Sequence, residues 1–367
     1  MLESTAPPLA RATIDRDGDA RALDDFAERF DADPAARVLA LHRGRALLAE
    51  QVEGSSPALE LRHPSALPPA QLRVYLGRTV RRGPADPDGA GSAPGTPVEV
   101  RVFDADAAAA IEPEAARWAG LRTAAPVLDE GQAALITEAI GLANWHDANA
   151  FCPRCGSTTS VEQAGWVRRC DRDGNLHFPR TDPAVIVLVT DDDDRVLLGS
   201  NALWEQHRFS LLAGFVEPGE SLEQTVVREI GEEAGIRVDR VAYAGSQPWP
   251  LPASLMLGFT ARVAADAASS ARPDGVEILE LRWFSRDELA AATTEIALPG
   301  ETSIARWLLE RWYGDRIVEG TPWEAPQTAQ TAQTAHTAQT AQTAQTAQTP
   351  QTPQASPTTP QRREEAQ

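Results

Sequence analysis

The chain has 367 residues, of which 53 are acidic and 34 are basic, and its formal net charge is −19. Such a charge argues against generic binding to nucleic acid or to anionic membranes, because both need a cationic surface. All 34 basic residues are arginines, which excludes Walker-type phosphate loops and lysine Schiff-base chemistry. Any polyanionic ligand would therefore have to be bound through metal ions and local arginines.

The first twenty residues contain acidic side chains and lack the apolar segment of a signal peptide. Nowhere does the chain show the run of about 18 apolar residues that a membrane span needs. We therefore expect a cytoplasmic protein without a membrane partner. Two of the three cysteines form the motif Cys152-Pro-Arg-Cys155, which suits a reducing compartment and a metal site better than a disulfide framework.

Residues 1–145 predict a separate N-terminal α/β domain without a catalytic constellation. Strand-like stretches at 36–41 and 98–103 are separated by turns rich in Pro, Gly and Asp, and residues 130–145 form an Ala-rich helical stretch. The composition of residues 83–97 is that of a flexible loop.

Residues 150–180 hold the cysteines, and residues 181–315 predict a second α/β domain. We expect a buried strand at 184–190, a solvated acidic turn at 191–194 rather than a calcium site, and a returning strand at 195–199. Further strands are expected at 240–245, 255–263 and 279–284, and a closing helix at 302–312. From residue 326 the chain becomes TAQ triplets, whose polar composition predicts a disordered tail without a catalytic role.

A short helix at residues 222–234 carries the main catalytic signal. Ser221 followed by Gln224 is a capping box, and Gly235 stands where a helix usually ends. On this helix Glu229, Glu232 and Glu233 share one edge, so their charges repel. A bound Mg²⁺ or Mn²⁺ ion would offset the repulsion, because both ions prefer oxygen ligands.

The segment around this helix resembles the Nudix box at every position of the motif. The matching residues are Gly214, Glu220, Arg228, Glu229, Ile230, Glu232, Glu233, Gly235 and Ile236. The resemblance implies an α/β fold, namely a Nudix α/β/α sandwich with a mixed sheet, and metal-dependent cleavage of a diphosphate. An ordinary solvated acidic helix does not require this spacing.

The sequence SQPWPLPAS at residues 246–254 follows the box. Its alternating prolines make a stiff extended segment, which alone would indicate a rigid loop or a peptide bound by an aromatic-lined partner. After a Nudix box it resembles the SQPWPFPxS signature of the NADH pyrophosphatase branch, with Leu251 where that branch usually has Phe. The resemblance extends over residues 150–313, and it fits the N-terminal domain more loosely.

The resemblance implies roles for individual residues. The metal ligands would be the backbone carbonyl of Ala213 and the carboxylates of Glu229, Glu233 and Glu277. Arg228 would orient the carboxylates, and either Glu232 or Glu233 would be the general base. The substrate would contact Phe178, Phe215, Gln247, Pro248, Trp249, Pro250, Leu251, Pro252, Ala253, Ser254 and the backbone of Ala305.

The reaction so implied is hydrolysis of the pyrophosphate of NADH or NAD⁺ to AMP and nicotinamide mononucleotide, with about two to three Mg²⁺ or Mn²⁺ ions. An NAD-capped RNA 5′ end presents the same pyrophosphate and is a further expected substrate, and the family pattern implies a homodimer. Two alternatives remain: hydrolysis of another nucleoside diphosphate such as ADP-ribose, or a regulator that keeps the fold without catalysis.

The same family carries a zinc ribbon with two CxxC pairs. Here the first pair is intact, but the second is Cys170-Asp-Arg-Asp173. We expect a structural zinc site of Cys152, Cys155 and Cys170, with either Asp173 or His177 as the fourth ligand. The alternative is a ribbon that has lost its metal and is held by packing.

Overall fold

The computed structural model describes residues 6–11, 14–51, 54, 56–80, 93–265 and 271–318. All of them belong to the unit Met1–Ala325. The expected tail at 326–367 and residues 83–92 of the expected loop lie outside the described residues. No helix in the described part of the chain is long and apolar enough to cross a membrane.

Each helix and strand that the sequence predicts is present, and the structure adds further helices and strands between them. The helices are α1 Phe26–Ala32, α2 Ala105–Ile111, α3 Leu121–Ala124, α4 Glu130–Ala148, α5 Leu222–Ala234, α6 Arg286–Ala292 and α7 Ile304–Tyr313. The strands are β1 Arg37–His42, β2 Arg45–Leu47, β3 Leu61–Arg62, β4 Leu72–Arg78, β5 Pro97–Val102, β6 Trp118–Gly120, β7 Thr159–Glu162, β8 Val167–Cys170, β9 Leu176–His177, β10 Asp182–Thr190, β11 Val196–Asn201, β12 Leu212–Phe215, β13 Val238–Trp249, β14 Ser254–Val263 and β15 Ile278–Phe284.

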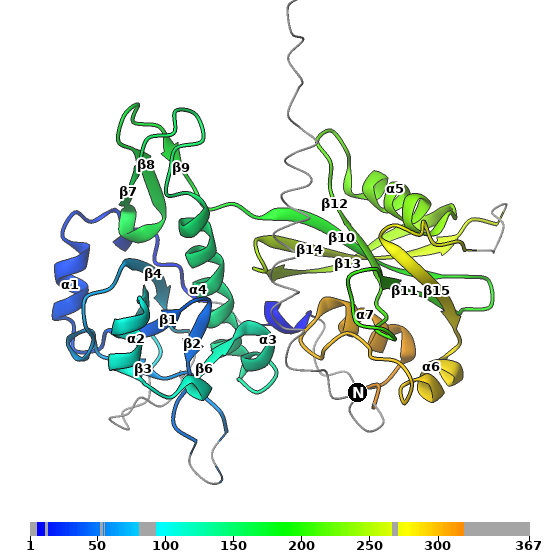
Figure 1. The fold of residues 1–367 in the computed structure, drawn as a ribbon, viewed down its shortest axis with the longest axis horizontal. Helices are drawn as coiled ribbons and strands as arrows, with labels where there is room; N and C mark the ends of the chain where they lie inside the picture. The colour runs from blue at the N-terminus through cyan, green and yellow to red at the C-terminus, as the bar shows by residue number, and fades with distance from the viewer. Residues whose placement is uncertain are drawn as a thin grey trace, which may run out of the picture. The chain divides into compact units, whose positions relative to one another are not determined.

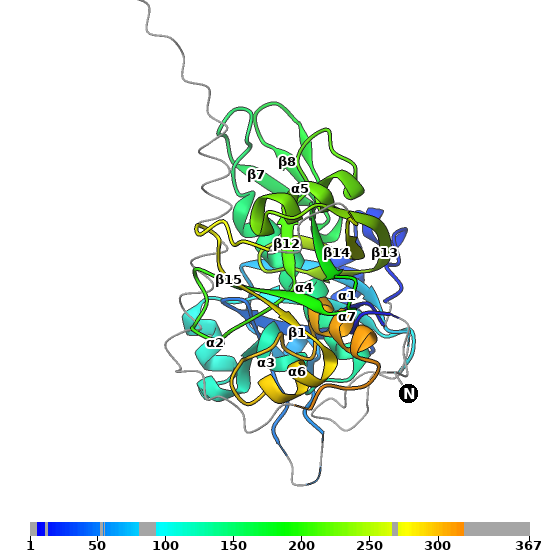
Figure 2. The same cartoon turned by 90° about the vertical axis from the view of Figure 1, so that its right-hand side faces the viewer.

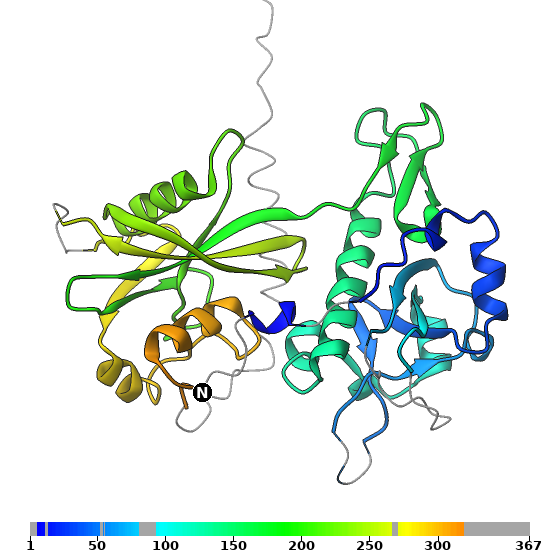
Figure 3. The ribbon, with the colours of Figure 1, turned by 180° about the vertical axis from the view of Figure 1, so that it is seen from behind.

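The N-terminal part is a six-stranded sheet in the order β4-β5-β1-β2-β6, with β3 paired to β1 (Figure 1). Side chains of β1 alternate between two apolar clusters. Leu39 and Leu41 pack in the cluster that includes residues of α4, whereas Ala40 packs with Ile111 of α2. Helix α4, seen from behind in Figure 3, is therefore fixed to one face of this sheet. The predicted helix at 130–145 is confirmed and is three residues longer.

The cysteine segment forms a three-stranded antiparallel ribbon in the order β7-β8-β9. The register pairs Thr159 with Cys170 and Arg168 with His177. The ribbon contacts the end of α4 through His146, whose Nε2 lies 2.8 Å from the carbonyl oxygen of Gly165.

The second sheet has the order β13-β14-β10-β11-β15, with β12 paired to β10. Strand β10 pairs parallel with β14 and antiparallel with β12, so the sheet is mixed. Val185 and Val187 of β10 face the cluster that contains α5, whereas Ile186 and Leu188 face the cluster that contains α6 and α7. The predicted α/β/α sandwich is confirmed, and Figure 2 shows α5 beside β12.

The structure differs from the sequence prediction at one turn and at one strand of the second domain. The prediction of a merely solvated turn at 191–194 is wrong for Asp191, which is buried. Its carboxylate accepts the backbone N–H groups of Asp193 and Arg195 and pairs with the Arg195 guanidinium, so it organises the turn. The strand expected at 240–245 runs on to Trp249, because the proline-rich segment continues β13 in extended form.

Candidate functional site

Helix α5 begins and ends as its sequence predicts. The hydroxyl of Ser221 accepts the backbone N–H of Gln224 at 3.2 Å, and the Gln224 side chain accepts the backbone N–H of Ser221 at 2.8 Å. Gly235 ends the helix in the left-handed region, with a φ of 66°. Val226 and Ile230 are fully buried, so the apolar face is anchored and the acidic edge has a defined position.

Arg228 lies at the centre of the acidic groups. Its guanidinium donates two hydrogen bonds to Glu220, of 2.6 and 2.9 Å, and one of 3.0 Å to Glu232. It also donates to the carbonyl oxygen of Phe215 at 2.9 Å and lies 2.9 Å from a carboxylate oxygen of Glu229. Arg228 lowers the pKa of Glu220 to about 2, and these carboxylates raise its own pKa. The contacts suit the orienting role that the sequence suggested.

Gly214 in β12 lies directly against the carboxylate of Glu229. A Cβ added at Gly214 would overlap the carboxylate carbon and both oxygens of that side chain. The Glu229 side chain is 12% exposed, and burial raises its pKa, while Arg228 opposes the rise. Glycine at position 214 thus leaves the space that the carboxylate occupies.

Glu233 is a buried carboxylate without a compensating donor. It is 5% exposed, and its Oε2 atom has no hydrogen-bond partner among the described residues. Burial raises its pKa to about 9, and the neighbouring Glu229, Glu277 and Asp274 carboxylates add to the rise. A bound divalent cation would reverse this penalty, because it favours the charged form. The donor set therefore fits Mg²⁺ or Mn²⁺.

The other two expected ligands are the backbone carbonyl of Ala213 and the carboxylate of Glu277. Ala213 lies in β12 opposite Ile186 of β10. Glu277 is exposed just before β15, in a turn where Asp274 accepts the backbone N–H groups of residues 276–278. In the described part of the chain, only the cysteine group brings three or more possible ligand atoms within 4.8 Å of one another. The carboxylates of α5 and Glu277 are more widely spaced than that.

The expected substrate residues fall into two sets. Phe178 and Phe215 are 60% and 44% exposed, so both rings are available for stacking. Gln247 is fully buried, where it accepts the backbone N–H of Leu9 and donates to the carbonyl oxygen of Thr302. Ala305 is buried within α7. The side chains of Gln247 and Ala305 are therefore part of the core.

The turn that follows β13 lies against the N-terminal sheet domain. Trp249 and Leu251 pack against the cluster that includes α4, and Arg122 lies 5.2 Å from the centre of the Trp249 ring. Pro248, Pro250, Ala253 and Ser254 line a cavity of about 370 Å³. Pro252 is exposed, and its carbonyl oxygen accepts a hydrogen bond from Asn144.

The zinc-ribbon segment contains two turns with the same backbone hydrogen bonds. In the first turn, Cys152 donates to the Ser157 carbonyl oxygen and accepts from the N–H of Gly156. In the second, Cys170 makes the equivalent bonds with residues 175 and 174. The glycine that follows each turn has a φ near 70°. Asp173 thus occupies the place in the second turn that Cys155 occupies in the first.

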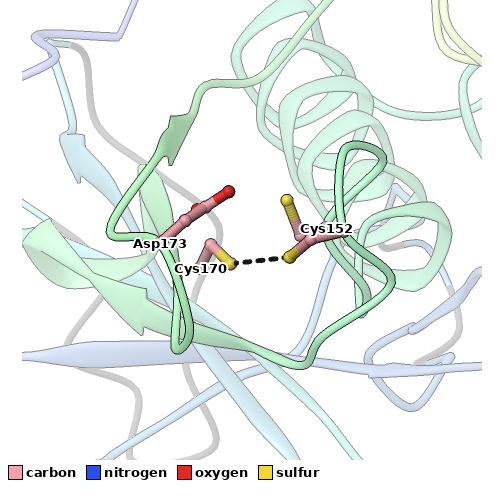
Figure 4. A group of neighbouring side chains, drawn as sticks. Cys152, Cys170 and Asp173 are labelled. Atoms are coloured by element: carbon pink, nitrogen blue, oxygen red, sulfur yellow. Dashed lines mark hydrogen bonds between the residues drawn. The ribbon is translucent and has the colours of Figure 1, made fainter.

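The four side chains of these turns face a common centre. Figure 4 shows Cys152, Cys170 and Asp173, which with Cys155 place their ligand atoms within 4.8 Å of one another. The sulfur atoms of Cys155 and Cys170 are 3.5 Å apart. A hydrogen bond to Asp173 raises the pKa of Cys170 to about 11 and lowers that of Asp173 to about 2, so the proton stays on the Cys170 thiol and a bound cation would displace it. His177 is not in this group.

Sequence reasoning missed two contributors to the acidic site. Glu220 was noted only as a motif position, yet it holds Arg228 through two hydrogen bonds. Asp274 organises the turn before Glu277, and the Asp-Gly pair at 274–275 was the available signal.

Three family models match the chain in succession. The NADH pyrophosphatase-like rudimentary NUDIX domain matches residues 35–145, the NADH pyrophosphatase zinc ribbon domain matches residues 147–178, and the NUDIX domain matches residues 180–307. A solved structure, a NUDIX hydrolase from Nitrosomonas europaea, aligns with a TM-score of 0.36 and 25% identity, covering 46% of this chain and 96% of that one.

Curated relatives align over about half of this chain. The NAD-capped RNA hydrolase NudC of Mycobacterium bovis is 46% identical over 202 residues, which cover 52% of this chain and 64% of that protein. The NAD-capped RNA hydrolase NUDT12 of Homo sapiens is 35% identical over 199 residues, which cover 50% of this chain and 42% of that protein. The aligned region is thus less than two thirds of either relative. With its three matched domains, the chain belongs to the Nudix superfamily, in the NADH pyrophosphatase branch.

Proposed function

We propose that the chain hydrolyses the pyrophosphate of NADH and NAD⁺ to AMP and nicotinamide mononucleotide. The observation that carries the proposal is Glu233, a buried carboxylate with an unpartnered oxygen next to Glu229. An unpaired buried carboxylate does not stabilise the fold, so we expect a bound cation to compensate its negative charge. The names of the curated relatives favour an NAD-type substrate.

In this proposal Glu229, Glu233, Glu277 and the carbonyl oxygen of Ala213 would hold about two to three Mg²⁺ or Mn²⁺ ions. Such ions would supply charge neutralisation at the pyrophosphate and would lower the pKa of water. Arg228 keeps the Glu229 carboxylate in place through its 2.9 Å contact.

The general base is assigned to Glu232. In this proposal the oxygens of Glu233 would serve as metal ligands, whereas the Glu232 side chain is 61% exposed and open to solvent. Its contact with Arg228 keeps it on the acidic edge of α5. The exposed rings of Phe178 and Phe215 provide surfaces on which a nicotinamide or adenine base can stack.

The names of the relatives also favour a second substrate, the NAD-capped 5′ end of RNA. That end carries the same pyrophosphate, so no different chemistry is needed. Because the net charge is −19, binding should be confined to the cap and should improve little with RNA length.

One assay tests the proposal. Purified protein is incubated with Mg²⁺ or Mn²⁺ and NADH, NAD⁺, ADP-ribose or NAD-capped RNA, and the released mononucleotides are quantified. Glu233→Gln should lower kcat by about 100-fold or more, which is about 2.7 kcal/mol. Glu223→Gln is the matched control, because it removes the same charge from an exposed position in the first turn of α5. Control and wild type should be equally active.

The alternatives give different results in the same assay. Faster turnover of ADP-ribose than of either dinucleotide would assign the chain to another nucleoside diphosphate. No turnover of any substrate by folded, metal-supplied protein would indicate a regulator. An active Glu233→Gln variant would contradict the site assignment itself.

Two further properties belong to the proposal. A structural zinc ion is assigned to Cys152, Cys155, Cys170 and Asp173, a donor set that fits tetrahedral coordination. We also propose a homodimer on the family pattern, and light scattering during gel filtration measures the mass that tests it.

A further inference from the structure

The turn between β13 and β14 is held by a side chain from the N-terminal sheet domain. Asn144 lies in α4, and its Nδ2 atom donates to the carbonyl oxygens of Pro250 at 2.9 Å and Pro252 at 3.2 Å. One amide group therefore binds the carbonyls on both sides of Leu251. The same helix approaches the turn at Gly141, where a Cβ would lie 3.3 Å from the Cβ of Pro250.

Side chains around the turn strengthen this attachment. Trp249 and Leu251 pack against the N-terminal cluster that includes α4, and the Arg122 guanidinium faces the Trp249 ring. Two residues before Trp249 in β13, the buried Gln247 accepts a hydrogen bond from the N–H of Leu9. The departure at Leu251 from the family signature thus lies on the side of the turn that contacts the N-terminal domain.

Backbone hydrogen bonds connect the turn with the acidic site. The N–H of Asp182 donates to the carbonyl oxygen of Ala253 at 2.8 Å, directly beyond Pro252. The next residue, Pro183, accepts the N–H of Val216 at 3.0 Å. Val216 follows Phe215, the last residue of β12, so two backbone hydrogen bonds link the turn to the end of the strand that carries Gly214.

We propose that Asn144 is a positioning residue for the dinucleotide substrate. By holding the carbonyls of Pro250 and Pro252, it fixes the segment Pro248–Ser254 relative to β10 and β12. The N-terminal domain thereby contributes to substrate binding without touching the reacting atoms. The inference rests on the proposed function, since it assigns this segment to the substrate site.

The test compares three variants of the full chain. Asn144→Ala removes both hydrogen bonds, and Asn144→Asp keeps the shape but replaces the donor with a charge that repels both carbonyls. Asn149→Ala is the matched control, because Asn149 caps the same helix by donating to the Trp145 carbonyl oxygen at 2.7 Å. Because the contact acts on bound substrate and transition state alike, KM for NADH should rise about fivefold to tenfold with kcat within about twofold.

Asn144→Asp should have the larger effect, and the control should match the wild type in both constants. An unchanged KM in both Asn144 variants would overturn the inference. So would a lower kcat with unchanged KM and a lower melting temperature, since that pattern indicates a purely structural residue.

A second measurement separates this inference from the proposed function. Hydrogen exchange of the Asn144 variants should be faster than wild type in residues 249–254 and in β12, whether or not NADH is turned over. Normal exchange in β12 would overturn the positioning role. A wild type that hydrolyses no dinucleotide would overturn the proposed function, and faster exchange in both segments of the variants would then still show that Asn144 holds the segment in place, without assigning it to a dinucleotide.

Discussion

Replacing Gly214 with alanine probes the packing of the Glu229 carboxylate against β12. The added Cβ would overlap the carboxylate of Glu229, which is 12% exposed and is held by Arg228 at 2.9 Å. The backbone of Gly214 does not have a positive φ, so alanine causes no conformational strain there. The substitution therefore acts on the position of one carboxylate and on little else.

The size of the effect follows from the displacement. To reach ordinary van der Waals contact with the new methyl group, the carboxylate must move by roughly an ångström or more. A misplacement of about 1 Å in a catalytic group costs about 100-fold in rate. We expect kcat/KM for NADH to fall by about that factor, equivalent to about 2.7 kcal/mol.

Gly231→Ala supplies the control, since it makes the same chemical change within α5. No atom lies within 4 Å of a Cβ at Gly231, so alanine should leave kcat/KM unchanged and raise the free energy of unfolding by about 0.5–1 kcal/mol. Both variants are assayed for NADH hydrolysis and for thermal unfolding. Wild-type kcat/KM in Gly214→Ala would refute the account of the contact with Glu229.

Two further predictions concern the ribbon and its support. Asp173→Ala should reduce zinc per chain, measured by elemental analysis, to below about half of the wild-type value, whereas His177→Ala should not; the opposite pattern would contradict the ligand assignment. Burial lowers the pKa of His146 to about 4. Between about pH 6.5 and pH 4 the unfolded state therefore takes up a proton that the folded state does not. As the pH falls through this range, the contribution of His146 should lower the free energy of unfolding by about 2–3 kcal/mol. Because carboxylates such as Glu233 also titrate in this range in both proteins, the test is the difference: denaturant unfolding should show a free energy of unfolding that changes between the two pH values by about 2–3 kcal/mol less favourably in wild type than in His146→Gln, and equal changes in both would contradict it.

The sequence predicts well those helices and strands whose limits are set by residues close by in the chain. The limits of α5 follow from Ser221, Gln224 and Gly235, all within a turn of the helix ends. The buried strand β10 follows from its continuous apolar run. The spacing of Glu229 and Glu233 on one helix edge is likewise a local property, so the candidate metal site could be predicted from the motif.

Contacts between distant segments could not be predicted in this way. Asn144 and Pro250 are 106 residues apart, and no pattern near either indicates their hydrogen bond. Gln247 belongs to the substrate signature, yet contacts with residues 9 and 302 bury it completely. The choice between Asp173 and His177 as the fourth ribbon ligand also required the fold, because only the geometry of the two turns distinguishes them.

The most direct test of the central claim is to locate the catalytic cations. Crystals soaked with Mn²⁺ and a slowly hydrolysed dinucleotide should show anomalous density between the carboxylates of Glu229 and Glu233. The pyrophosphate should lie on the same ions, in contact with the edge of α5. Bound dinucleotide with no anomalous density at these carboxylates would contradict the claim.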